Sequence, residues 1–132
     1  MAMNLEGTTP LIADTLVNTY IAGEDILTIG NIVELSADWT VRRAVTQNSL
    51  KVVGINLTIA KNGSKISIVG RGICRVIPYT SLSAGDQFGS AGGGGGASAG
   101  TALQDNTSKN ATILGVCIQG GNSAGTAIVR IW

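Results

Sequence analysis

The side chains that could perform chemistry are few in this chain of 132 residues. It has no histidine, and so lacks both the commonest general base and the commonest zinc ligand. Its two cysteines, Cys74 and Cys117, each stand alone in an apolar stretch, which is typical of small core residues. Acids such as Glu24, Asp25 and Asp86 fall in predicted turns, where turn hydrogen bonding accounts for them. We therefore expect no enzyme, no cofactor and no metal site.

The glycine run Gly92–Gly96 raises the question of phosphate binding. A phosphate-binding loop needs glycines that lead through Gly-Lys-Ser/Thr into the N-terminus of a helix. Neither that ending nor a helical pattern follows this run, so nucleotide binding is not expected. Five glycines also lose much entropy on ordering and carry no side chains that compensate for it. The run predicts a flexible, exposed connection.

Charged residues are sparse and unevenly placed. They form 13% of the chain, against about a quarter in typical domains. Either copies of the chain or partners cover much of its surface, which we favour, or Ser, Thr, Asn and Gly supply its solubility. The first 41 residues hold six acidic and no basic residues, whereas the rest hold nine basic and two acidic ones. Either the acidic segment meets a basic surface elsewhere, or the two parts compensate each other inside one fold. Because the basic residues are dispersed and not interleaved with aromatic ones, we expect no nucleic-acid binding.

The N-terminal sequence MAMNLEGTTPLIADTLVNTY has neither the basic start nor the long apolar stretch of a secretion signal. No apolar run approaches the roughly 20 residues that a membrane-spanning helix needs. We therefore expect no membrane partner, and assembly in a cytoplasm.

Local pattern predicts strands throughout the chain. Candidate segments are rich in Val, Ile and Thr and are separated by Gly, Asn and Asp. They span residues 25–29, 31–35, 40–45, 50–60, 65–70, 72–79, 101–104, 111–119 and 126–132. Asn62-Gly63 predicts a hairpin with a type I′ turn, in which both residues take positive φ. The segment around residues 10–23 predicts at most one or two helical turns.

An internal repeat organises these strands. IAGEDI at 21–26 resembles SAGDQF at 83–88, and LKVVGINL at 50–57 resembles TILGVCIQ at 112–119, about 61 residues later. Two weakly similar halves, 21–80 and 81–132, would then form a single β domain (21–132), with the glycine run in the place of GNIVEL. Chance similarity in a chain rich in Gly and Ala is the alternative.

The order of these motifs resembles the small capsid cement, or head-decoration, proteins of bacteriophages. The acid-bearing turn Ala22-Gly23-Glu24, the strand Val52–Asn56 and the stretch SKISIVGRGICRV at 64–76 carry the resemblance, with ILGVCI and GNSAGTAIVRIW further along. It covers roughly residues 20–132.

The resemblance implies an all-β fold, a compact β-barrel or β-sandwich of jelly-roll or β-clip type. It also implies a non-enzymatic virion protein that binds the outer surface of an icosahedral head and stabilises contacts between capsid subunits. Its partners would be the major capsid protein and further copies of itself, as a homotrimer or, alternatively, a dimer. Two other interpretations stay open: a tail or fibre subunit of a virion, and a small non-catalytic β-barrel binding module, for which Trp39 and Trp132 would offer a glycan platform.

Residues 1–20 fall outside the matching motifs and predict an extended N-terminal arm. Such an arm can add a strand to an exposed sheet edge, and its acids can meet a basic rim. The alternative is that this segment completes the protein's own barrel or trimer. The candidate contacts to the capsid or to a neighbouring subunit are Leu5, Glu6, Leu11, Ile12, Asp14, Leu16 and Val17.

Overall fold

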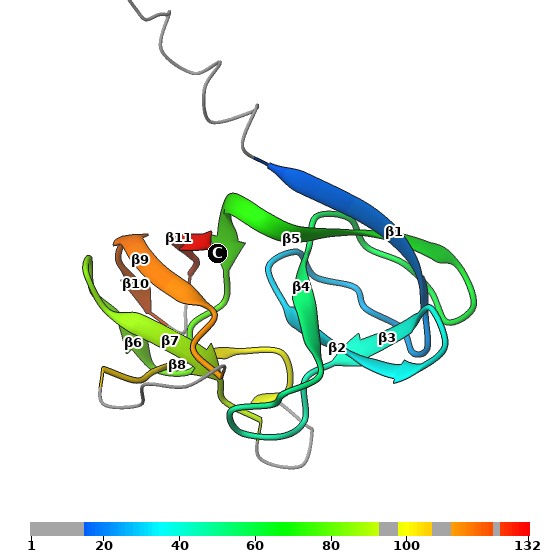
Figure 1. The fold of residues 1–132 in the computed structure, drawn as a ribbon, viewed down its shortest axis with the longest axis horizontal. Coiled ribbons are helices and arrows are strands. Elements are labelled where there is room, and N and C mark those ends of the chain that lie inside the picture. The colour runs from blue at the N-terminus through cyan, green and yellow to red at the C-terminus, as the bar shows by residue number, and fades with distance from the viewer. Residues whose placement is uncertain (1–14, 93–97, 107–111, 123–124) are drawn as a thin grey trace, which may run out of the picture.

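The computed structural model describes residues 15–92, 98–106, 112–122 and 125–132, and their regular structure is entirely β (Figure 1). The strands in the first part of the chain are β1 (Leu16–Ala22), β2 (Ile32–Ala37), β3 (Thr40–Arg43), β4 (Val52–Asn56) and β5 (Lys65–Val76). Those that follow are β6 (Ser81–Leu82), β7 (Gln87–Ser90), β8 (Ala102–Gln104), β9 (Gly115–Gln119), β10 (Gly121–Asn122) and β11 (Ala127–Ile131). The prediction of an all-β barrel is confirmed.

The first five strands close into a barrel in the order β1-β3-β2-β4-β5, with β5 returning to β1. β1 runs parallel to β3 at Ile21 and Ala22, and antiparallel to the first half of β5 along its length. Alternate residues of β5, such as Ile66 and Ile68, are buried inside this barrel, whereas Lys65 faces solvent. This period of two is the pattern expected of a strand with one buried face.

Strand β5 connects the two halves of the molecule and spans the top of Figure 1. Its second half, Gly72–Val76, pairs with β11, and the sheet continues through β9, β7 and β8. β8 then reaches back to the chain just beyond β5 through a parallel bridge between Pro78 and Ala102. The second half therefore repeats the strand pairings of the first. In each half one pairing is parallel, that of β1 with β3 in the first and that of the chain at Pro78 with β8 in the second.

Within this repeat, β9 holds the place of β4, as the similarity of 50–57 and 112–119 predicts. The glycine run, however, does not take the place of GNIVEL. β7 pairs with β8 and β9 as β2 pairs with β3 and β4, so β7 is the counterpart of β2. Because β7 begins directly after Asp86, the run falls between β7 and β8, where the first half has only the turn Asp38–Trp39.

Residues 93–96 of the run lie outside the described residues, but Gly92 is described and buried. A Cβ on Gly92 would overlap backbone atoms of Thr46 and Gln47. The prediction of an exposed connection is therefore wrong at its first residue, because the chain packs there against the first half.

Four local predictions differ from the structure. Residues 16–22, where the sequence predicts at most helical turns, form strand β1, because β3 and β5 both pair with them. Residues 25–29 form only an isolated bridge at Ile26, because the Thr28 carbonyl bonds to side chains instead of a neighbouring strand. The segments 65–70 and 72–79 are not separate strands: β5 runs through the glycines between them, since partners on both sides hold the ladder. The turn after Lys61 has positive φ at Gly63 and not at Asn62, which fits type II and not type I′.

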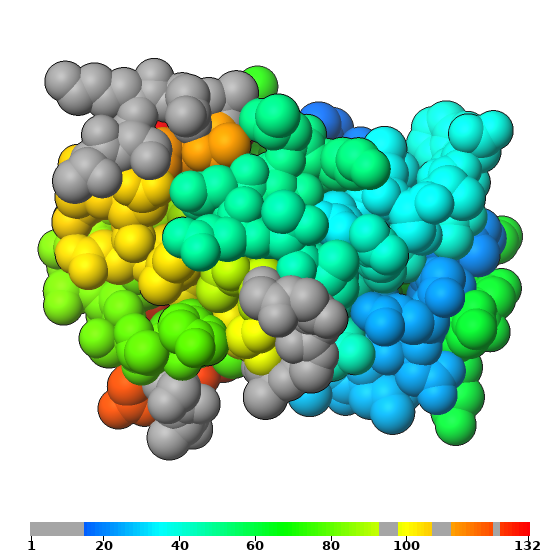
Figure 2. Space-filling view, turned by 90° about the horizontal axis from the view of Figure 1, so that it is seen from below, coloured from blue at the N-terminus to red at the C-terminus, as the bar shows by residue number. Residues whose placement is uncertain are grey.

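The halves share one of the two hydrophobic clusters found among the described residues, and the other lies inside the first barrel. A single cluster combines Ile32, Ile55 and Val69 of the first half with Phe88 and Val129 of the second. Backbone hydrogen bonds also cross the join, from Ile32 to Gly100 (2.7 Å) and from Asn48 to Ser90 (2.9 Å). Figure 2 shows the teal segment that precedes and includes β4 lying across this join. The two halves are therefore packed as one unit.

Strand β1 begins at Leu16, so it crosses the predicted arm boundary at residue 20. Residues 16–20 pair with β5 in the protein's own barrel. Residues 1–14 lie outside the described residues.

Candidate interaction surfaces

The two cysteines are buried and unlinked, as the sequence predicts. Val129 of β11 pairs with Cys74 on one side and with Cys117 on the other, so two strand spacings separate the thiols. That separation, about 9.5 Å between Cα atoms, exceeds the roughly 7 Å that a disulfide tolerates. Burial raises the pKa of the Cys74 thiol to about 12, and burial, with the nearby Asp86 charge, also raises the pKa of Cys117. Neither thiol is placed to act as a nucleophile.

The turn acids stabilise the fold, and they do so in equivalent ways in the two halves. Glu24 accepts hydrogen bonds from the backbone amide (2.8 Å) and guanidinium (3.1 Å) of Arg43 in β3. Asp86 accepts bonds from the Ser83 amide (2.8 Å) and from the Gln104 side chain (3.2 Å) in β8, the counterpart of β3. Glu24 thus links its turn to β3, and Asp86 links its turn to β8.

These contacts set the pKa of both acids. Burial alone would raise the pKa of Glu24, but the hydrogen bonds and charge of Arg43 outweigh it and lower the pKa. The Ser83 amide, with Asn106 and Gln104, lowers the pKa of Asp86. Both carboxylates are therefore ionised at neutral pH and serve as hydrogen-bond acceptors.

The uneven charge distribution is compensated at least partly inside the fold. Glu34 is buried and pairs with Arg42 across β2 and β3 (3.0 Å), and Glu24 pairs with Arg43 (3.1 Å). Two of the six acidic residues in the first 41 therefore pair with Arg42 and Arg43, which directly follow that segment. Across the described ranges, no cluster of three or more His, Cys, Asp or Glu side chains could hold a metal ion. No helix in the same ranges is long and apolar enough to cross a membrane.

Of the predicted contact residues, two can be placed. Leu16 and Val17 lie at the start of β1, opposite Arg71 and Val69 of β5, and are 54% and 44% exposed. The other five (Leu5, Glu6, Leu11, Ile12 and Asp14) lie outside the described residues. These two sequence neighbours therefore lie on an exposed part of the first barrel.

A larger apolar surface was not among the predicted sites. We call it the loop patch: Leu27, Ile29, Leu57 and Ile59, all exposed. Its two segments are joined by the bridge between Ile26 and Ala60, and the Asn56 side chain donates to the carbonyls of both Thr28 (2.7 Å) and Thr58 (3.0 Å).

The alternation of side chains explains why this patch faces outward. The Thr28 hydroxyl accepts a bond from buried Asn31, and the Thr58 hydroxyl accepts one from the Ser67 amide. Because the threonines are held to the body of the protein, the aliphatic residues that alternate with them are left in solvent. Apolar residues gathered in this way are typical of interaction sites. The alternation Leu27-Thr28-Ile29 and Leu57-Thr58-Ile59 is the sequence signal that could have identified the patch.

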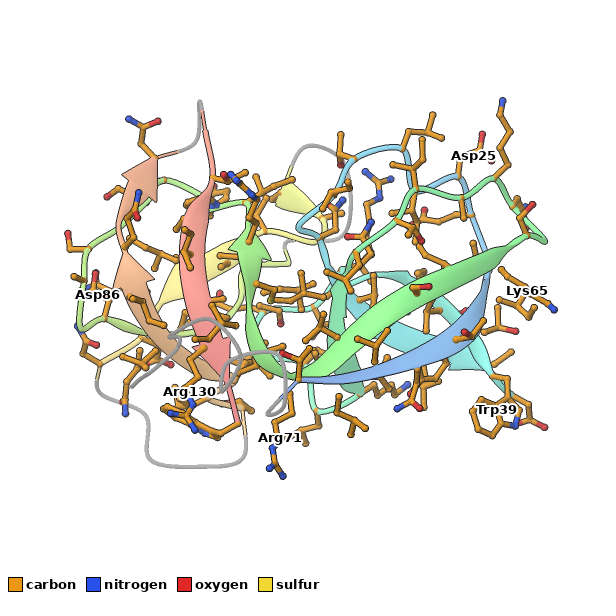
Figure 3. The ribbon with its side chains drawn as sticks, turned by 90° about the horizontal axis from the view of Figure 1, so that it is seen from above. Asp25, Trp39, Lys65, Arg71, Asp86 and Arg130 are labelled. Carbon is orange, nitrogen blue, oxygen red and sulfur yellow. The ribbon has the colours of Figure 1, made fainter. Side chains whose placement is uncertain are left out.

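A second surface lies at the far end of the first barrel, at the turn between β2 and β3. We call it the turn groove: a pocket of about 350 Å³ lined by Tyr20, Leu35, Ala37, Asp38 and Trp39. The Tyr20 and Trp39 rings lie 5.8 Å apart, tilted by 38°. Trp39 is 69% exposed and projects from the end of the molecule (Figure 3), and Trp132 is also exposed. Neither tryptophan is a core residue.

Comparison with known proteins gives a match in fold but none in sequence. No protein-family model matches the sequence, and no curated protein matches it. The fold is similar to the crystal structure of the N base of the head fibre protein gp8.5 of bacteriophage phi29, with a TM-score of 0.62 and 14% identity. The match covers 89% of this chain and 94% of that one, so the likeness extends over both halves. The two chains share a fold.

Proposed function

We propose that this protein is a structural component of a bacteriophage virion that binds the outer surface of the icosahedral head. The observation that carries the proposal is the fold shared with the base of a phage head fibre over nearly the whole of both chains. The motif order that resembles head-decoration proteins points independently to the same part of a virion.

The surface chemistry supports a docked protein. Charged residues are sparse, and the loop patch exposes four aliphatic side chains on neighbouring segments. Burying such side chains at an interface stabilises it by roughly 25 cal/mol for each square ångström removed from water. We propose that the loop patch is covered on the particle, by the major capsid protein or by a neighbouring copy in a homotrimer.

Two roles on the head are distinguishable. A cement protein stabilises contacts between capsid subunits, whereas the base of a head fibre anchors an appendage. The head-fibre neighbour favours the second role, and the motif resemblance favours the first. Heat resistance separates them, because only a cement protein should raise the temperature at which heads release DNA.

The test uses heads that lack the protein. Purified protein is added, and bound copies for each capsid subunit are counted by quantitative gel densitometry and electron microscopy. We expect saturable decoration at a copy number set by head symmetry. Absence of binding to heads, or binding only to tails, would overturn the proposal.

Variants of the loop patch sharpen this test. Leu27→Lys and Ile59→Lys should each weaken decoration about tenfold or more, since a buried charge replaces an apolar contact. Ile118→Lys is the matched control, because Ile118 of β9 is similarly exposed (47%) but lies outside the patch. Circular dichroism and the oligomeric state of each variant show whether a loss arises at the head or within the trimer.

A further inference from the structure

The turn groove contains a tryptophan that the fold does not require. Ala37 pairs with Thr40, so Asp38 and Trp39 alone make the turn between β2 and β3. Trp39 has a φ of 54°, a left-handed conformation that Gly and Asn adopt most easily. Its ring is mostly in solvent. Folding alone would favour a small residue here, so a bulky exposed ring indicates another use.

The groove has a distinct chemical lining. Two aromatic rings and the side chains of Leu35 and Ala37 give it an apolar wall, and Asp38 gives it a single carboxylate. Among the described residues, the Asp38 carboxylate accepts no hydrogen bond and forms no ion pair, although its backbone carbonyl accepts a bond from the Thr40 hydroxyl. A free negative charge beside exposed aromatic faces favours a cation that has an apolar stem.

The neighbouring cations do not fill this role. Arg42 and Arg43 of β3 are held by Glu34 and Glu24. Lys65 is at the same end of the molecule in Figure 3, at the start of β5 opposite Ile21, but no ion pair in the described part of the chain joins it to Asp38. The carboxylate is therefore available to a charge from outside.

We propose that the turn groove binds a lysine or arginine side chain presented by a partner protein. The aliphatic stem packs along Leu35 and the ring faces, and the cationic head lies against the rings and the Asp38 carboxylate. A sugar ring also stacks on tryptophan and would find the Tyr20 hydroxyl as a hydrogen-bond partner, but a free carboxylate beside two aromatic faces favours a cation over a neutral sugar. The proposal does not depend on the role of the protein on a phage head.

The experiment measures binding by the fluorescence of Trp39. The Trp132→Phe variant of the full chain leaves Trp39 as the only tryptophan, because the sequence contains two. The probes are N-acetyl-lysine methylamide and N-acetyl-norleucine methylamide, which share an aliphatic stem and differ in charge. At low salt, lysine should bind about fivefold or more tightly than norleucine, and Asp38→Asn should reduce the difference to less than about twofold.

Several results would overturn this proposal. Equal affinity for the two probes would show an apolar site without charge recognition, and tighter binding of methyl β-glucoside than of the lysine probe would show a glycan platform. If the Asp38→Asn variant kept the full preference for lysine over norleucine, the Asp38 carboxylate would not take part in binding.

A separate pair of variants distinguishes binding from folding. Trp39→Gly and Trp39→Asn should fold with an unchanged or higher melting temperature, because both residues accept the left-handed φ. Nuclear magnetic resonance titrations with the lysine probe, which do not need the Trp39 signal, should show that both variants lose the lysine binding seen with the wild type. A clear fall in melting temperature in both would show that Trp39 is retained for packing, and would overturn the argument.

Discussion

Gly54 of β4 and Gly115 of β9 occupy the same position in the two halves of the protein. A Cβ on Gly54 would overlap the carbonyl oxygen of Val69 in β5, and a Cβ on Gly115 would overlap that of Arg130 in β11. Both pairs have the same spacing in the sequence, and 61 residues separate one pair from the other. Each glycine lets two neighbouring strands approach closely.

Replacing either glycine by alanine should therefore destabilise the protein strongly, by about 3 kcal/mol or more, because the neighbouring backbone must move. Urea unfolding measures the change in the free energy of unfolding. Gly125→Ala is the control, since a Cβ there meets no atom within 4 Å. If Gly54→Ala or Gly115→Ala kept wild-type stability, the close approach of the two strands would not require glycine at that position.

The shared core predicts a single unfolding transition. One cluster joins Ile32 and Val69 to Phe88 and Val129, so unfolding of one half would expose the core residues of the other that pack against it. Fluorescence and far-ultraviolet circular dichroism should give coincident urea midpoints for the wild type and for both glycine variants. Two separated transitions would indicate that the halves fold independently.

Glu24→Gln should reduce stability by about 1 kcal/mol at neutral pH, an amount limited by the partial exposure of this ion pair. The folded pKa of Glu24 lies below its ordinary value, so its contribution is present above that ordinary value and is lost as pH falls through the folded pKa. The melting temperatures of variant and wild type should converge in acid. Asp38→Asn, which removes no described contact of the side chain, is the control and should leave stability at neutral pH close to that of the wild type.

The cysteines should resist alkylation in the folded state. With the pKa of Cys74 at about 12 and that of Cys117 also raised, almost no thiolate exists near pH 8, and both groups are buried. Iodoacetamide followed by mass spectrometry should find neither site labelled in native protein, and both labelled in urea without reductant. A Cys74–Cys117 peptide would contradict the structure.

Deletions at the N-terminus should separate an arm from a barrel strand. Removing residues 2–13 leaves β1 intact, so the melting temperature should change little, and head decoration then measures what that segment contributes. Removing residues 2–18 cuts into β1, which pairs with β5 from Leu16 onward, and should lower the melting temperature clearly. Equal stability of the two deletions would show that the start of β1 is dispensable.

The sequence alone determined the fold class, most strand positions and the repeat. Val, Ile and Thr in short runs between Gly and Asn signals predict β2, β3, β4 and β11 nearly where they lie. The match of Gly54 with Gly115 is visible in the sequence at a fixed offset, and it marks positions where a side chain cannot fit. The place of each cysteine alone in an apolar stretch also predicted that both would be buried and unlinked, as they are.

Only the tertiary structure decided how these pieces pair. β1 carries a weak local pattern and is a strand because β3 and β5 both bind it, whereas residues 25–29 carry a strong pattern and lose their strand partner to the Asn31 and Asn56 side chains. The loop patch and the turn groove combine residues from segments far apart in the chain, such as Leu27 with Ile59 and Tyr20 with Trp39. Local preference sets which residues can extend, but long-range hydrogen bonding and packing decide which of them meet.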